Sequence, residues 1–236
     1  MKRIFLGALA VGLLTVGAFV LAPSRTAKAE DFESLKPGAV KWKVVDYNRI
    51  TTHPARIPFK LAVGADGGIG FDFLSTPDTA LLGTSHPSYK GDLFGDMTGE
   101  TLSATVGVTV TPGTQFTYYG QPDACGNPAY VRFYFETDTS GKFEYTDYWW
   151  SNPVHANLDD LKNFGDQTLV VDMSDPAMWS DWNGQVGTTD PAAFAAAVKN
   201  VKFVGLSFGG GCFFENGVGV AGGSGSFRLM DFTATP

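Results

Sequence analysis

The chain has 236 residues, of which 44% are hydrophobic and only 17% are charged, and its formal net charge is −7. A chain of this length can bury a substantial core and suits one large all-β domain better than two small ones. Its acidity argues against nucleic acid and anionic lipid as partners, because both would be repelled, and leaves neutral glycans, cations and basic proteins.

Residues 1–29 have the pattern of a signal peptide. Two basic residues precede an apolar run over residues 4–22, and Ala27 and Ala29 form an A-x-A cleavage site. The alternative is an uncleaved transmembrane anchor, because a run of this length could just span a bilayer. Cleavage after Ala29 is favoured and predicts a secreted, extracellular protein. It removes four basic and no acidic residues, which takes the net charge from −7 to −11.

Glycine and proline punctuate the remaining residues, 30–236, at the spacing of sandwiches and barrels. Between them lie short apolar or alternating runs that predict strands. In chain order these are residues 40–47, 56–63, 69–74, 101–110, 130–137, 142–150, 168–173, 201–208 and 226–234. The clearest is 101–110, in which every second residue is apolar. The runs 130–137 and 142–150 predict a hairpin across the intervening turn.

One short helix is predicted before the penultimate strand. Asp190 is a suitable N-cap, Pro191 fits the first helical position, and Phe194 and Val198 would pack against a sheet edge. The predicted fold is therefore all-β, a single antiparallel jelly-roll β-sandwich with one short helix.

The chain contains two cysteines, Cys125 and Cys212. In an exported protein an even count predicts a disulfide, which would stabilise the fold by about 4 kcal/mol in the chain-entropy model. Two buried free thiols are the alternative. No cysteine–histidine cluster suggests zinc.

Two glycine motifs near the end of the chain resemble catalytic signatures, and we interpret both as structural. Residues 205–209 fit G-x-S-x-G, but glycines follow where the motif needs a helix, and no histidine follows Ser207. We expect Ser207 to face outward. Residues 217–222 fit G-x-G-x-x-G but precede another strand, not a helix. We expect these glycines to form a wide loop.

Two segments together resemble the laminin IV type A (laminin B) domain. Residues 93–96 and 101–103 match its aromatic turn and following strand, and residues 191–234 match its helix, penultimate strand, glycine-rich loop and final strand, with Asp231 at the acidic position. The resemblance implies a jelly roll similar to galactose-binding-like domains. It also implies extracellular binding or adhesion without catalysis, and a structural calcium ion with Asp231 among its ligands.

Aromatic residues provide the main indication of function. Exposed rings stack on the apolar faces of sugars, while nearby carboxylates and amides bind the hydroxyl groups. Consecutive Trp149 and Trp150 must point to opposite faces of a regular strand, so we expect one of them to be partly exposed. The predicted ligand platform consists of Tyr148, Trp149, Trp150, Trp179 and Trp182, with Asp147 as a polar neighbour. The alternative is that these rings pack the core.

Acidic residues suggest two further sites. Asp92, Asp96 and Glu100 share a glycine-rich turn, and Asp92 and Asp96, with Asp231, are candidate calcium ligands. A glycosidase would need two carboxylates flanking a cleft, and the candidates Glu136, Glu144, Asp147 and Glu215 show no spacing that singles out a pair. The sequence therefore predicts a secreted, non-catalytic, carbohydrate-binding module. The alternatives are an adhesive protein with an extracellular protein partner and, after that, a glycoside hydrolase.

Overall fold

The computed structural model describes residues 26–30, 41–46, 51–54, 68–85, 93–118, 129–138, 141–210 and 217–236. Cys125, Cys212, Asp92 and Glu215 lie outside these residues, as do the first 25 residues and the predicted strand 56–63. The disulfide, the leader and the role of Asp92 therefore stay predictions.

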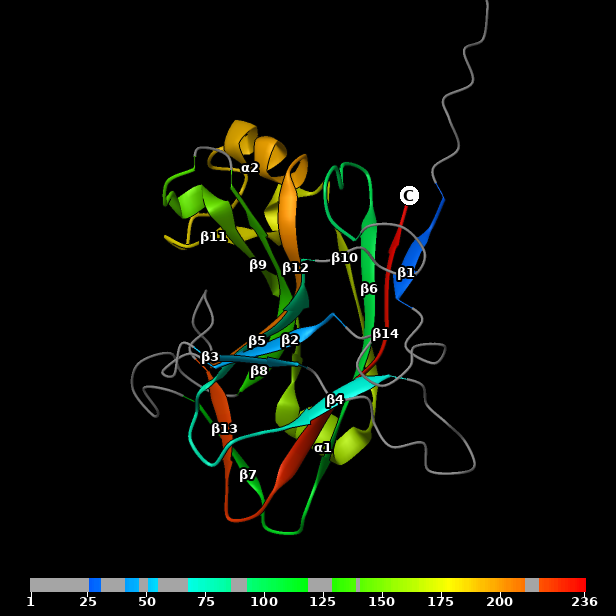
Figure 1. The fold of residues 1–236 in the computed structure, drawn as a ribbon, viewed down its shortest axis with the longest axis vertical. Helices are drawn as coiled ribbons and strands as arrows, with labels where there is room; N and C mark the ends of the chain where they lie inside the picture. The colour runs from blue at the N-terminus through cyan, green and yellow to red at the C-terminus, as the bar shows by residue number, and fades with distance from the viewer. Residues whose placement is uncertain are drawn as a thin grey trace, which may run out of the picture.

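The described residues form two antiparallel sheets (Figure 1). The smaller sheet has the order β1-β14-β6-β10, with β4 also paired to β14. Its strands are β1 (Lys28–Glu30), β4 (Ile69–Asp72), β6 (Thr101–Val110), β10 (Gln167–Asp172) and β14 (Gly225–Thr235).

The larger sheet has the order β11-β9-β8-β12-β5-β13-β7. In addition, β2 pairs with β5, and β3 pairs with β2. Its strands are β2 (Lys43–Asp46), β3 (Thr51–Pro54), β5 (Thr79–Thr84), β7 (Gln115–Tyr118), β8 (Tyr130–Thr137), β9 (Tyr148–Asn157), β11 (Ser180–Asp181), β12 (Val201–Gly209) and β13 (Val218–Ala221). The antiparallel β-sandwich predicted from the sequence is confirmed.

The two sheets bury an aromatic core between them. Alternate residues of β6 face this core, as predicted, and Leu102, Ala104 and Val106 are fully buried. Phe208 of β12 packs edge-on against Phe227 of β14, with ring centroids 4.9 Å apart. Packing between sheets therefore fixes which face of each strand is apolar.

Two α-helices lie toward opposite ends of the molecule in Figure 1: α1 (Leu158–Phe164) and α2 (Pro191–Val198). Helix α2 is the predicted one: Asp190 caps it by accepting from the Ala193 N–H at 3.0 Å, and Phe194 and Val198 are buried. Helix α1 was not predicted. Asn157 caps it, accepting from the Asp159 N–H at 2.8 Å.

Three local predictions need correction. Strand β9 begins at Tyr148, not at residue 142, because the preceding residues form a loop that ends in the 3₁₀ helix η1 (Tyr145–Asp147). Ser207 does not face outward but is completely buried, because both faces of β12 are covered. Part of the predicted glycine loop is strand β13.

The glycine motifs have backbone roles. A Cβ at Gly205 would collide with the Leu82 carbonyl of neighbouring β5, so only glycine allows that close approach. Gly217 and Gly222 have φ angles of 79° and 73°, in the left-handed region that favours glycine.

The chain around the predicted cleavage site is part of the smaller sheet. Residues Lys28–Glu30 form β1 and pair with β14, so the sheet extends across the predicted boundary at Ala29. Across the described ranges, the structure contains no helix with the length and apolarity needed to cross a membrane.

Candidate functional site

The candidate site lies on the outer face of the larger sheet, toward its β11–β9–β8 edge. Side chains of β8 alternate: Val131, Phe133 and Phe135 enter the core, which leaves Tyr134 and Glu136 on the other face. Strand register places Tyr134 opposite Trp150 and Glu136 opposite Tyr148 on β9.

Aromatic rings form a continuous row on this face. We call it the aromatic row; its members are Tyr145, Phe143, Tyr148, Trp182, Trp150, Tyr134 and Phe203. Neighbouring ring centroids are 5.1 to 5.9 Å apart along the row. Most of these pairs are tilted or edge-on, the arrangements that aromatic rings prefer.

Exposure is greatest at one end of the row and lowest in its middle, at Trp150 and Tyr134, and Phe203 at the other end is partly buried. Phe143 and Tyr145 are 59% and 53% exposed, whereas Trp150 is completely buried. Tyr148 and Trp182 are partly buried and lie between these extremes. The contiguous accessible part of the row is therefore Phe143, Tyr145, Tyr148 and Trp182, which gather at one end of the sheet.

Two short loops hold three of these rings, Phe143, Tyr145 and Trp182, and Tyr148 is the first residue of β9. In the first, Asp147 and Glu144 cap η1 reciprocally, and the Asp147 carboxylate accepts from the Glu144 N–H at 3.2 Å. In the second, the Asp181 carboxylate accepts from the N–H groups of Asn183 and Gln185, both at 2.9 Å.

A backbone hydrogen bond joins the two loops. The Trp182 N–H donates to the Tyr145 carbonyl at 3.3 Å. Fixed loops keep the rings in place without a ligand, and this preorganisation lowers the entropic cost of binding.

Glu136 provides a carboxyl beside the row. Burial raises its pKa above 4.5; a hydrogen bond from the Tyr134 hydroxyl, at 3.3 Å, opposes the shift, and the negative charges of Asp147 and Asp138 add to it. Asp147 is itself 3% exposed. The combination of an apolar ring surface with hydrogen-bonding carboxyls suits a polyhydroxylated ligand.

A polar chain lies next to the row on the same sheet. The Arg132 guanidinium donates to the Asn152 amide oxygen, and the Asn152 amide nitrogen donates to the Ser180 hydroxyl. Arg132 is 2% exposed. These contacts connect β8, β9 and β11 and support the floor of the site.

The structure divides the predicted aromatic platform. Tyr148 and Trp182 belong to the accessible part of the row, with Asp147 next to them. Trp149, Trp150 and Trp179 are at most 1% exposed, so their prediction as stacking surfaces is wrong.

The reason is that β9 is covered on both faces. Phe194 of α2 packs on Trp149 with ring centroids 5.0 Å apart, and Trp182 packs on Trp150 at 5.6 Å. The expectation that one of the two consecutive tryptophans is exposed fails for this reason.

Sequence reasoning missed Phe143, the most exposed ring of the row. It was assigned to a regular strand, where it would alternate with its neighbours. The available signal was the run of polar residues and glycine at 138–142, a composition that favours a loop over a strand.

The predicted calcium ligands do not form a site among the residues that the structure describes. Asp96 is exposed and accepts from the Thr98 N–H at 3.0 Å, as in a simple turn. Asp231 lies on β14, where burial raises the pKa of its carboxyl against a hydrogen bond from the Phe232 N–H. The described ranges contain no group of three or more residues suited to holding a metal ion.

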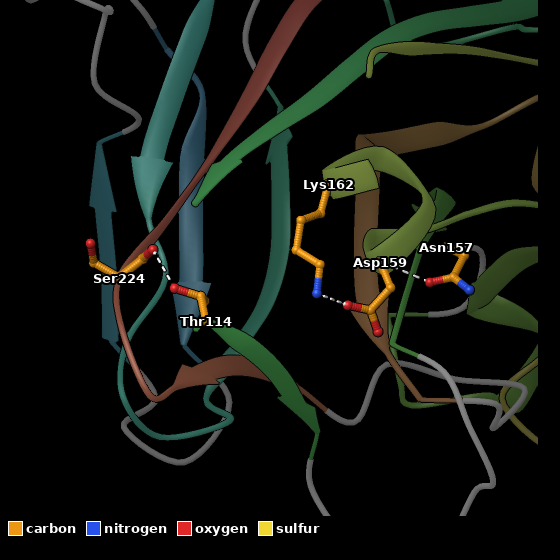
Figure 2. Close-up of polar contacts among 5 residues, drawn as sticks. All are labelled: Thr114, Asn157, Asp159, Lys162 and Ser224. Atoms are coloured by element: carbon orange, nitrogen blue, oxygen red, sulfur yellow. Dashed lines mark hydrogen bonds and ion pairs between the residues drawn. The ribbon is translucent and has the colours of Figure 1, made fainter. Parts of the chain in front are cut away.

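A second candidate site is a hollow of about 460 Å³ between the β6–β7 turn and Lys162 of α1. Figure 2 shows its polar contacts: the Lys162 ammonium pairs with Asp159 at 2.6 Å, and the Thr114 hydroxyl donates to the Ser224 carbonyl at 3.0 Å. Because these groups already bind one another, we consider this pocket the weaker candidate.

Comparison with known proteins does not assign a family. No family model and no curated protein matches the chain. One similar solved structure comes from work on endo-acting O-glycanases with which prominent members of the human gut microbiota initiate mucin breakdown. Its TM-score is 0.45 at 10% identity, over 88% of this chain and 97% of that one. A likeness this distant gives this chain neither a family nor an activity.

Proposed function

We propose that this protein is an exported, non-catalytic carbohydrate-binding protein. The ligand stacks on Phe143, Tyr145, Tyr148 and Trp182, Glu136 accepts hydrogen bonds from its hydroxyl groups, and the buried Asp147 carboxylate holds the loop that carries Phe143 and Tyr145. The observation that carries the proposal is that Phe143 and Tyr145 are both more than half exposed and belong to one ordered ring cluster beside these carboxyls. Isolated exposed rings are common, but clusters beside polar groups mark binding surfaces.

Two other observations support this function. The net charge of −7, or −11 after leader removal, favours an uncharged ligand over an anionic one. The sequence resemblance to laminin IV type A domains supports an extracellular binding role. The same surface could bind a protein, so the experiment must separate the two kinds of ligand.

The test is a screen of glycans and polysaccharides against the secreted protein, with calcium and with a chelator. We expect a neutral glycan to bind and to change tryptophan fluorescence, because Trp182 lies in the contact surface. Phe143→Ala and Tyr145→Ala should each weaken binding by about tenfold, the loss expected for one stacked ring. If the chelator abolished glycan binding, the binding site would also contain a metal ion.

Phe164→Ala is the matched control. Phe164 is 81% exposed on α1, outside the aromatic row, so its removal changes surface hydrophobicity but not the proposed site. Equal losses in Phe143→Ala and Phe164→Ala, or no glycan binding under either condition, would contradict the proposal and favour a protein ligand.

The same material tests for catalysis. Incubation with the bound glycan should release no new reducing ends. If reducing ends were released, and Glu136→Gln abolished their release, the protein would be a glycoside hydrolase and the proposed non-catalytic function would be wrong.

A further inference from the structure

Strand β1 occupies one edge of the smaller sheet. Its residues pair with β14 in antiparallel register, with Lys28 opposite Ala234, Ala29 opposite Thr233 and Glu30 opposite Phe232. Cleavage after Ala29 would remove all of β1 except its last residue. The edge of β14 that β1 covers would then lose this partner.

Lys28 also neutralises a buried carboxylate. Its ammonium lies 3.6 Å from Glu100 Oε1 and 3.6 Å from the sulfur of Met97. Glu100 is 1% exposed, and its second oxygen, Oε2, has no hydrogen-bond partner among the described residues. Glu100 precedes β6, which pairs with the other side of β14.

Leader removal therefore has two physical consequences at one place. It uncovers backbone N–H and C=O groups on β14, and unpaired edge groups invite another strand. It also takes away the cation beside Glu100, and a buried charge without its partner is strongly unfavourable. Both are relieved by an extended segment that places a cation where Lys28 lies.

We infer that the processed protein uses the β14 edge and Glu100 as a docking site for an extended protein segment that carries a lysine or arginine. The segment adds a strand to the sheet, and its basic side chain pairs with Glu100. The register of β1 gives the expected geometry: antiparallel to β14, with the basic residue opposite Ala234. This inference rests on the predicted cleavage and is independent of the aromatic row.

The first step of the test is the N-terminal sequence of protein secreted from the full-length gene, which should begin at Glu30. A synthetic peptide of residues 22–29, the segment that cleavage removes, is then titrated into this protein. We expect it to bind, and a Lys28→Ala peptide to bind about tenfold more weakly or worse, because a buried ion pair has lost one partner.

A second variant makes the contact intramolecular. Because β1 runs antiparallel to β14, which ends at Thr235, residues 26–30 can be appended after Pro236 through a short hairpin turn. This added strand should raise the Tm by about 5 °C or more and block the peptide. The same extension with Lys28→Ala leaves the domain unaltered and should lose most of the gain.

Glu100→Gln provides the control for charge. In this background the Lys28 and Lys28→Ala peptides should bind equally, because the carboxylate that distinguishes them is gone. Secreted protein that retains Lys28 would overturn the inference. The inference would also be overturned if the peptide did not bind because a second copy of the protein fills the edge. The same holds if the peptide bound equally well with and without Lys28.

Discussion

Trp179→Ala separates structural rings from ligand-binding rings in this protein. Trp179 is completely buried, its ring packs edge-on against Phe135 with centroids 4.9 Å apart, and its Nε1–H donates to the Asp172 carbonyl at 3.0 Å. Truncating a buried aromatic side chain to alanine costs about 3–5 kcal/mol, and the lost hydrogen bond adds about 1 kcal/mol.

The expected loss is therefore about 4–6 kcal/mol in the free energy of unfolding. A domain of this size shifts its Tm by about 2–4 °C for each kcal/mol, so the Tm should fall by about 8–24 °C. Urea denaturation followed by circular dichroism measures the loss, and Trp179→Phe should recover most of it. Glycan affinity, measured where the variant is still folded, should not change.

One result would refute the reasoning. If Trp179→Ala left the urea midpoint unchanged and abolished glycan binding, the ring would be at the surface in solution. The original prediction of Trp179 as a stacking residue would then be restored.

Further predictions concern single groups. Glu136→Gln should stabilise the protein at about pH 7 and lose this advantage below about pH 4.5. The reason is that the pKa of Glu136 is raised in the folded state, so its ionisation destabilises the fold as the pH rises. Urea midpoints across this pH range measure the effect. Ser207→Ala should be neutral or stabilise by up to about 1 kcal/mol, since the buried hydroxyl has no hydrogen-bond partner among the described residues; a lower urea midpoint would contradict this. Asp190→Ala should cost about 0.5–2 kcal/mol through the lost helix cap, measured the same way. Mass spectrometry with trapped thiols should find Cys125 linked to Cys212 in secreted protein, and two free thiols would contradict the disulfide.

Features set by neighbouring residues were predictable from the sequence. The alternation over residues 101–110 correctly gave both the strand β6 and its buried face, because side chains of a strand point alternately to its two sides. Asp190 followed by Pro191 correctly marked the start of α2, because both residues act within the first helical turn. Helix α1 escaped prediction because its seven residues are too few for a clear helical period.

Exposure of the aromatic rings was not predictable, because it depends on contacts between distant parts of the chain. Trp150 is hidden by Trp182, which a separate loop after β11 brings onto its ring. The alternation rule assigns Trp149 and Trp150 to opposite faces but cannot show that both faces are covered. The raised pKa of Glu136 has the same origin, since its largest cause is burial of the carboxyl in the folded protein.

Strand β14 has a consequence for how the chain reaches its folded state. It pairs with β4 and β6, which precede it by more than a hundred residues. The smaller sheet therefore cannot close until nearly all of the described chain has been made. Such distant pairing makes folding slow and leaves the edge of β6 open to aggregation while the chain is incomplete. A chain that folds in this order needs its last strand before either side of the smaller sheet is complete.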